Sequence, residues 1–246
     1  MRYLCDPHII PTVVPQDLAG IESYARSVAT YTDSLHVDAG DGIFVTNTTW
    51  PFCEPHQLEE LDAFASRVVL PPGFSLDAHI MAEDARSVGE RFARAGFRRI
   101  TVHLEAFEKP EDARAALDSF RALGAKEAGL ALKIETPISA VEGLVDSCDF
   151  VHLMSIAIIG SQGYAFDERA LSRVEEMHAA FPELLVAVDG GVTEATVEEL
   201  VRAGANMLMV GHVLAESSEP AATYARIHDR AMKGCAPLEA AFQVAA

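Results

Sequence analysis

The chain has 246 residues, half of them hydrophobic, which suits a domain large enough to fold around its own core. Its 37 acidic residues against 19 basic ones give a formal net charge of −18, which argues against nucleic-acid and anionic-membrane partners. No apolar run approaches the roughly 18 residues of a membrane helix and the polar opening MRYLCDPH is no signal peptide, so we expect a cytoplasmic protein.

Short β-branched runs alternate with longer amphipathic segments along the chain. The runs predict strands at 8–14, 34–38, 75–81, 98–104, 128–134, 149–156, 184–190 and 206–211. The amphipathic segments predict helices at 17–29, 55–67, 84–95, 110–123, from about 139, and at 167–180, 193–203 and 217–233. Because helices separate the strands, the strands should pair in parallel through crossovers.

Eight such units predict a single (β/α)8 TIM barrel over residues 1–235. A doubly wound open sheet is disfavoured, because PQDLAG follows the first strand where a GxGxxG turn would be expected. Three glycines, Gly96, Gly124 and Gly204, should end helices in the left-handed conformation. The apolar tail, 236–246, is either a free end or a subunit contact.

The four cysteines are far apart in the sequence and form no CxxC pair. Neither a zinc ribbon nor a dense disulfide framework is indicated by this spacing. We therefore expect reduced thiols at Cys5, Cys53, Cys148 and Cys235, as in most cytosolic proteins.

Polar residues end several of the predicted strands on the side that faces the barrel axis. His36 and Asp38 share one face of the second strand, His79 lies in the third, and Asp189 ends the seventh. Taken singly, a strand histidine can be a packing residue and a terminal Asp can cap the next helix. Taken together, the four should meet at the mouth of the barrel, where functional groups of this fold gather.

Two carboxylates buried near each other repel unless a cation lies between them. Two imidazoles and two carboxylates suit one divalent metal ion, either zinc, ferrous iron, manganese or cobalt. We therefore interpret His36, Asp38, His79 and Asp189 as a candidate metal site.

The strand ends also resemble those of the ribulose-phosphate 3-epimerase family. The matching segments, in order, are HVDAGDGIFVTN (36–47), LDAHIM (76–81), ITVHLEA (100–106), HLMS (152–155) and VDGGV (188–192). The resemblance extends from about Pro11 to Glu216 and implies a metal-dependent isomerase, commonly oligomeric, with the same four metal ligands. It further implies that Asp38 and Asp189 are the acid/base pair, one on each face of a small phosphorylated sugar.

That chemistry accounts for the residue types. Epimerisation next to a carbonyl removes a weakly acidic proton and returns one to the opposite face, which requires two bases and stabilisation of an enediolate. A metal ion supplies such stabilisation as a Lewis acid. D-Ribulose 5-phosphate is the first choice of substrate, with D-xylulose 5-phosphate as product.

Other residues at the same mouth are candidates for contacts with the substrate. They are His36, His79, Met81, Met154, Gly163, Gly190, Gly191, Gly211 and His212. The methionines either form an apolar roof or fill the core. The glycines after strands seven and eight either admit a phosphate to the backbone or serve as turn residues. In the family, the Gly-rich loop matching 159–166 closes over the substrate.

The rim departs from the family pattern at several places. Pro15 replaces a serine after the first strand, and Ala39 replaces a methionine, which should leave a larger cavity. The segment ALKIETP should bring Lys133 and Glu135 near the mouth. The flap reads IGSQGY, and His212 occupies a position that is usually small.

These departures leave other functions open. A roomier pocket would suit a ketohexose 6-phosphate, and the altered flap would suit a barrel that binds a sugar phosphate without turning it over. A hexulose-phosphate synthase-like lyase would need a DxKxxD strand end, whereas this chain has DAGDG, which lacks the lysine.

Overall fold

The computed structural model describes residues 5–235, which form a closed barrel of eight parallel strands. The strands are β1 His8–Val13, β2 Ser34–Gly40, β3 Ser75–Met81, β4 Arg99–His103, β5 Glu127–Leu132, β6 Phe150–Met154, β7 Leu185–Asp189 and β8 Met207–Val210. Each strand pairs with the next one along the chain, and β8 closes the ring by pairing with β1. The predicted single (β/α)8 TIM barrel is confirmed.

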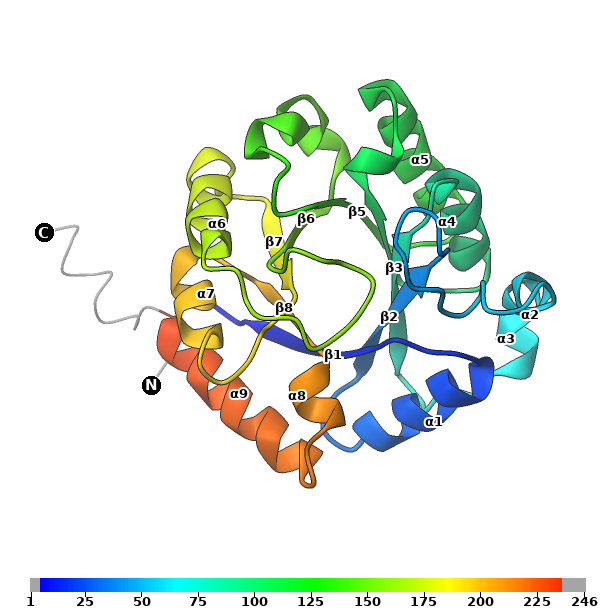
Figure 1. Cartoon of the computed structure of the whole chain (residues 1–246), viewed down its shortest axis with the longest axis horizontal. Coiled ribbons are helices and arrows are strands. Elements are labelled where there is room, and N and C mark those ends of the chain that lie inside the picture. The colour runs from blue at the N-terminus through cyan, green and yellow to red at the C-terminus, as the bar shows by residue number, and fades with distance from the viewer. Residues whose placement is uncertain (1–4, 236–246) are drawn as a thin grey trace, which may run out of the picture.

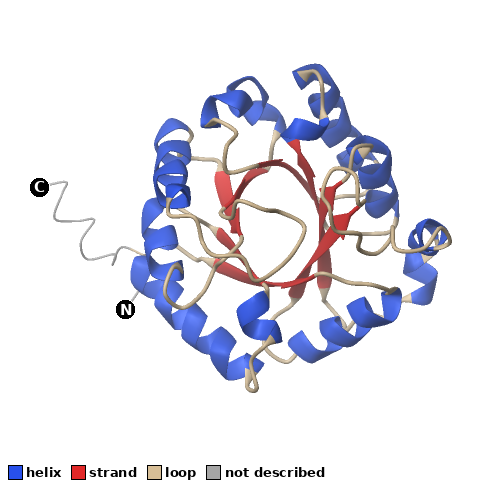
Figure 2. Ribbon diagram, viewed as in Figure 1, coloured by secondary structure: helices blue, strands red, loops and turns tan. Residues whose placement is uncertain are grey.

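Helices surround the ring of strands on all sides (Figures 1 and 2). They are α1 Leu18–Val28, α2 Gln57–Asp62, α3 Phe64–Arg67, α4 Ala85–Arg94, α5 Pro110–Ala122, α6 Arg169–Ala180, α7 Val197–Ala203, α8 His212–Ala215 and α9 Pro220–Gly234. Two 3₁₀ segments, η1 Leu104–Ala106 and η2 Ile138–Ser147, complete the set. The helix expected from about 139 is therefore a 3₁₀ segment, and the one expected over 55–67 is divided at Ala63.

Local signals in the sequence explain where these elements begin and end. The Asp84 side chain accepts a hydrogen bond from the Ser87 backbone at the start of α4. The predicted helix over 217–233 starts instead at Pro220, because proline is favoured in the first turn and cannot continue an earlier helix. The three glycines expected to be left-handed are so, with φ of 92° at Gly96, 123° at Gly124 and 119° at Gly204.

Alternation of side chains along each strand produces two separate cores. Outward residues such as Leu35 and Val37 pack against the helices in the larger core. A smaller cluster fills the barrel itself and consists of Ile10, Phe150, Ala187, Met207 and Met209. Because apolar side chains plug the middle of the barrel, the polar inward residues are confined to its two ends.

The expectation of four reduced thiols is wrong for two of the cysteines. Cys5, just before β1, and Cys235, just after α9, form a disulfide across 230 residues of sequence. Closure of the ring brings the two ends of the chain together, and no local spacing motif announces such a pair. Cys53 and Cys148 are free thiols.

Within residues 5–235, no helix combines the length and apolar character that crossing a bilayer requires. The predicted tail at 236–246 lies outside the described residues.

Candidate active site

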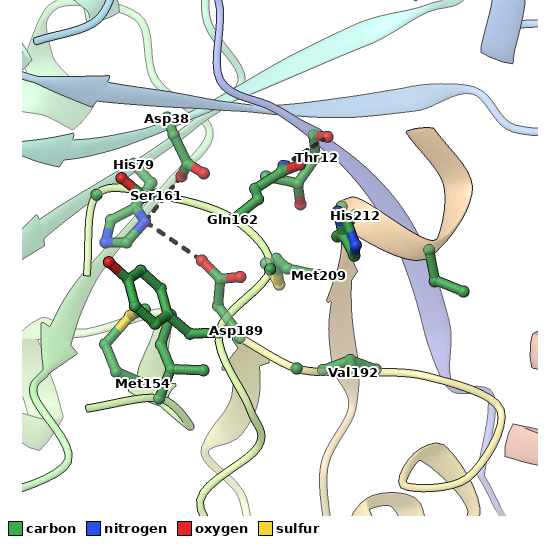
Figure 3. A pocket seen from close by; sticks show the side chains of 18 of the residues that line it. Thr12, Asp38, His79, Met154, Ser161, Gln162, Asp189, Val192, Met209 and His212 are labelled. Atoms are coloured by element: carbon green, nitrogen blue, oxygen red, sulfur yellow. Dashed lines mark hydrogen bonds and ion pairs between the residues drawn. The ribbon is translucent and has the colours of Figure 1, made fainter. Parts of the chain in front are cut away.

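A cavity opens at the C-terminal ends of the strands (Figure 3). Strand ends supply Thr12, Asp38, His79, Met81, Met154, Asp189 and Met209 to its wall. The loops supply Ile156, residues 160–164, residues 190–193 and residues 211–213. Every predicted substrate contact lines this cavity except His36, which lies fully buried.

The four predicted metal ligands meet at the base of this cavity. Nδ1 of His79 lies 3.1 Å from Oδ1 of Asp38 and 3.5 Å from Oδ2 of Asp189. Nε2 of His36 lies 3.6 Å from Oδ1 of Asp38. The parallel register explains these contacts, because it places Asp38 of β2 beside His79 of β3.

A third imidazole, which sequence reasoning missed, lies in the same cluster. His152 of β6 is fully buried, and its Nε2 lies 3.4 Å from Oδ2 of Asp189. Single donor atoms of His36, His79, His152 and Asp189 all lie within 4.8 Å of one another. The signal for His152 was present in the sequence, since it precedes Met154 by two positions and so faces the barrel axis too.

His103 and Glu105 form a second missed feature, a chain of hydrogen bonds that ends on His79. The Nε2 atoms of His79 and His103 lie 2.9 Å apart, and Nδ1 of His103 lies 3.1 Å from Oε2 of Glu105. The other oxygen of Glu105 accepts from the backbone of Lys133 and from the hydroxyl of Thr136.

This chain of bonds determines where the ring protons lie. A carboxylate only accepts, so His103 donates to Glu105 from Nδ1 and accepts at Nε2. His79 must therefore donate from its own Nε2. Its Nδ1 then faces Asp38 and Asp189, where it donates a proton to these carboxylates or, once a cation displaces that proton, offers its lone pair as a metal ligand.

The two aspartates have opposite pKa shifts. Burial raises the pKa of Asp38 to about 6, although a hydrogen bond with His79 opposes that shift. Burial also acts to raise the pKa of Asp189, but contacts with His152 and His79 outweigh it and leave that pKa well below its usual range. Two carboxyl groups that differ in this way suit one proton donor and one proton acceptor.

The histidines divide in the same manner. Burial lowers the pKa of His36 and of His152, and lowers that of His103 to about 4. Burial acts the same way on His79, but contacts with Asp189 and Asp38 outweigh it and raise that pKa to about 9. Neutral buried imidazoles carry the lone pairs that a metal ion needs.

The residues present therefore fit a divalent metal ion. Both ring nitrogens of His36 and of His152 are buried and have no hydrogen-bond partner among the described residues. The cavity wall contains no lysine or arginine that could neutralise Asp38 and Asp189. A cation would satisfy the imidazole lone pairs and separate the two carboxylates.

Glycines shape the side of the cavity formed by the loops after β7 and β8. Gly190 and Gly191 have φ of 112° and 64°. A Cβ on Gly190 would lie 2.7 Å from Ile156, and one on Gly191 would lie 2.8 Å from the Phe166 backbone. Larger residues would push the loop after β7 away from the loop after β6, so these two glycines are required here by close packing as well as by conformation.

The loop between β6 and α6 crosses over the mouth of the barrel (Figures 1 and 2). Two bonds hold it there: Asn47 donates to the carbonyl of Gly160 at 2.9 Å, and Gln162 donates to the carbonyl of Thr12 at 3.2 Å. Thr12 was also missed from the sequence, although it is inward-facing on β1. The hydroxyl of Thr12 is buried without a hydrogen-bond partner in residues 5–235.

Ala39 does not line the cavity, so its small side chain does not enlarge it as expected. Ala39 points outward into the core between strands and helices, because it alternates with the inward Asp38. The inward neighbour is Gly40, where a Cβ would lie 2.8 Å from the carbonyl oxygen of Asn47. The loop after β2 therefore occupies the space that a side chain at position 40 would take.

Lys133 and Glu135 lie near the mouth but not in the wall of the cavity. Nζ of Lys133 lies 4.0 Å from the centre of the Phe44 ring, in a neighbouring hollow. Glu135 is exposed and pairs with Arg169 at 3.2 Å. Pro15 is likewise outside the wall, whereas His212 lines it beside Gly163.

Comparison with known proteins gives the same family as the motifs. Residues 8–215 match the model of the ribulose-phosphate 3-epimerase family. A ribulose-phosphate 3-epimerase from Aquifex aeolicus is 36% identical over 183 residues, which cover 73% of this chain and 76% of that protein. One from Bacillus subtilis is 30% identical over 217 residues, which cover 86% and 93%.

Solved structures share the fold at low identity. A 3-keto-L-gulonate-6-phosphate decarboxylase from Vibrio cholerae has a TM-score of 0.67 at 16% identity, covering 92% of this chain and 97% of its own. A 3-hexulose-6-phosphate synthase from Salmonella typhimurium has a TM-score of 0.65 at 14% identity, covering 92% and 99%. At such identities the likeness establishes the barrel alone.

Proposed function

Because this chain belongs to the ribulose-phosphate 3-epimerase family, a family of isomerases, we propose that it inverts carbon three of a phosphorylated ketose. The substrate is D-ribulose 5-phosphate and the product D-xylulose 5-phosphate. The observation that carries the proposal is the pair Asp38 and Asp189, which come from different strands and both approach Nδ1 of His79.

In this proposal the two aspartates exchange protons with opposite faces of the substrate. One carboxylate removes the proton from carbon three, and the other carboxyl group returns a proton from the far side. The positions of Asp38 on β2 and Asp189 on β7, strands that are not neighbours in the ring, support such a division of roles. The methionines Met81 and Met154 form an apolar wall that keeps the local dielectric low.

A divalent cation held by His36, Asp38, His79 and Asp189 belongs to the proposal. When bound, it stabilises the negative charge that develops on the substrate oxygens. Zinc, ferrous iron, manganese and cobalt all suit this donor set. The hydrogen-bond chain from Glu105 through His103 keeps the Nδ1 lone pair of His79 directed at the site.

The remaining contacts hold and enclose the substrate. Backbone N–H groups around Gly190, Gly191 and Gly211 receive the phosphate, with His212 beside them. The loop over the mouth, which includes Gly163, excludes water from the reacting carbon. The outward position of Ala39 removes the reason to expect a larger sugar, so a pentulose phosphate is favoured.

Three further features complete the proposal. The barrel, described over residues 5–235, acts as one unit. The chain assembles as a homo-oligomer, which sedimentation analysis would test. A cytoplasmic location is also proposed; the Cys5–Cys235 disulfide is unusual for that reducing compartment.

Solvent exchange tests the reaction directly. Incubation of the metal-loaded protein with D-ribulose 5-phosphate in deuterated water should place deuterium on carbon three and produce D-xylulose 5-phosphate. Exchange with a ketohexose 6-phosphate alone would change the substrate assignment. No exchange with either sugar, with metal fully bound, would contradict the proposed activity and favour a barrel that only binds sugar phosphates.

A further inference from the structure

We propose that His152 is a fifth protein donor to the cation, beside His36, Asp38, His79 and Asp189. This inference rests on the proposed function, because it assumes that a metal ion occupies the cluster. It adds a donor from β6, on the far side of the barrel from β2.

The burial of His152 indicates that its ring has a polar partner in the working protein. The side chain is fully buried, yet neither ring nitrogen has a hydrogen-bond partner within residues 5–235. Leaving a buried polar group unsatisfied costs about 1–3 kcal/mol. A leucine would fill a packing role at this position without that penalty, so packing alone does not account for an imidazole.

The position of the ring identifies the partner. Its Nε2 lies 3.4 Å from Oδ2 of Asp189, and its ring centre lies 4.6 Å from that of His79 and 5.5 Å from that of His36. These three neighbours, Asp189, His79 and His36, are already assigned to the metal. The nitrogen therefore faces the place where the cation would lie.

The distances permit a single cation to reach this donor set. Zinc binds imidazole nitrogen at about 2.0–2.1 Å, so two donors on opposite sides of one ion lie at most about 4.2 Å apart. Donor atoms of His36, His79, His152 and Asp189 lie within 4.8 Å of one another. Side-chain shifts of a few tenths of an ångström would bring all four into bonding range.

His152 therefore changes the expected balance of the site. The four donor atoms that all lie within 4.8 Å of one another do not include one from Asp38. Asp38 approaches only two of these residues, His79 and His36. Three imidazoles and Asp189 can retain the cation by themselves. Asp38 is then the carboxylate that can move while the metal stays bound.

Zinc binding tests the inference without relying on activity. A crystal structure of the zinc-loaded wild-type protein should place Nε2 of His152 at about 2.0–2.1 Å from the metal. In a competition titration with a chelating dye, His152→Leu should weaken zinc binding at least about tenfold, a loss typical even of groups that only support ligands. Phe150→Leu, an inward residue two positions earlier on β6, is the matched packing control and should retain wild-type affinity.

The outcomes separate this inference from the proposed function. Zinc bound in the wild-type protein with His152 more than about 3 Å away would overturn the inference and leave the four-ligand site standing. Unchanged affinity in folded His152→Leu would overturn it as well. Failure of the wild-type protein to bind zinc, iron, manganese or cobalt would contradict both. If His152→Leu does not fold, the distance between Nε2 of His152 and zinc in the wild-type crystal structure tests the inference by itself.

Discussion

The two ends of the barrel interior both bury carboxylates, but they neutralise them differently. At the N-terminal end, Asp77 and Glu127 flank Arg99, whose guanidinium lies 3.0 Å from Asp77 and 2.5 Å from Glu127. At the C-terminal end, Asp38 and Asp189 face histidines and no lysine or arginine lines the cavity. One end carries its own cation, whereas the other end is built to receive one.

The ion pair at the N-terminal end is structural, whereas the group of aspartates and histidines at the C-terminal end is a candidate functional site. The Arg99 guanidinium stays in place beside one oxygen of Asp77, so this carboxylate already has a cation next to it. Imidazoles and carboxylates without such a partner can hold a metal ion and exchange protons. The four predictions that follow test this contrast, from the largest expected effect to the smallest.

The largest effect is expected from the aspartates at the C-terminal end. Asp38→Asn and Asp189→Asn each remove a group that transfers a proton, so kcat should fall by about 10²–10⁴-fold. Asp77→Asn removes a buried carboxylate at the opposite end of the barrel and should leave kcat nearly unchanged. Steady-state kinetics on metal-loaded proteins would check this, and near-normal turnover in both Asp38→Asn and Asp189→Asn would refute the two-base assignment.

The next effect concerns stability at the N-terminal end. Arg99→Leu leaves Asp77 and Glu127 without their shared cation, which should lower the free energy of unfolding by about 3–5 kcal/mol. Arg98→Leu is the matched control, because Arg98 also pairs with Glu127 but is half exposed, and it should cost at most about 1 kcal/mol. Urea unfolding of the two variants would measure both losses; equal losses would contradict the contrast.

The pH dependence of stability tests the same end. Burial raises the pKa of Asp77 to about 6, although Arg99 opposes that shift. Between the unfolded value of about 3.9 and this folded value, the folded state binds a proton that the unfolded state has released. This contribution is therefore full below pH 3.9 and is lost as the pH rises through 6.

The measurement compares the wild-type protein with Asp77→Asn by urea unfolding at several pH values. The wild-type free energy of unfolding, relative to that of the variant, should fall by about 2 kcal/mol between pH 4 and pH 7. A difference that instead grows with pH would mean that Arg99, and not burial, dominates the pKa of Asp77.

The smallest effect is expected from the hydrogen-bond chain behind His79. In Glu105→Gln the amide oxygen still accepts from Lys133, so its NH₂ group faces His103. Nδ1 of His103 then accepts from this NH₂ group, and Nε2 of His103 donates to Nε2 of His79. The proton of His79 therefore lies on Nδ1, the metal-binding atom, which should weaken metal affinity about 10–100-fold. Glu108→Gln, an exposed change nearby, should have no effect in the same titration. Unchanged metal affinity in Glu105→Gln would show that the hydrogen bonds from Glu105 through His103 do not control how His79 binds the metal.

The amino-acid sequence by itself determined the barrel and the core of the site. Apolar strands separated by amphipathic helices allow few folds, because each helix must cover the sheet between two parallel strands. Alternation along β2, β3 and β7 directs His36, Asp38, His79 and Asp189 toward the axis. These features are local, so a periodicity of two or 3.6 residues suffices to recognise them.

Only the tertiary structure decided which distant residues join them. His103, His152 and Thr12 lie on strands whose inward faces were equally readable, but the depth at which each side chain meets its neighbours depends on the stagger of the closed barrel. The Cys5–Cys235 bond and the space beside Gly40 depend on ring closure and on one loop folding over a strand. Contacts between residues far apart in sequence leave no periodic signal, and therefore only the folded chain reveals them.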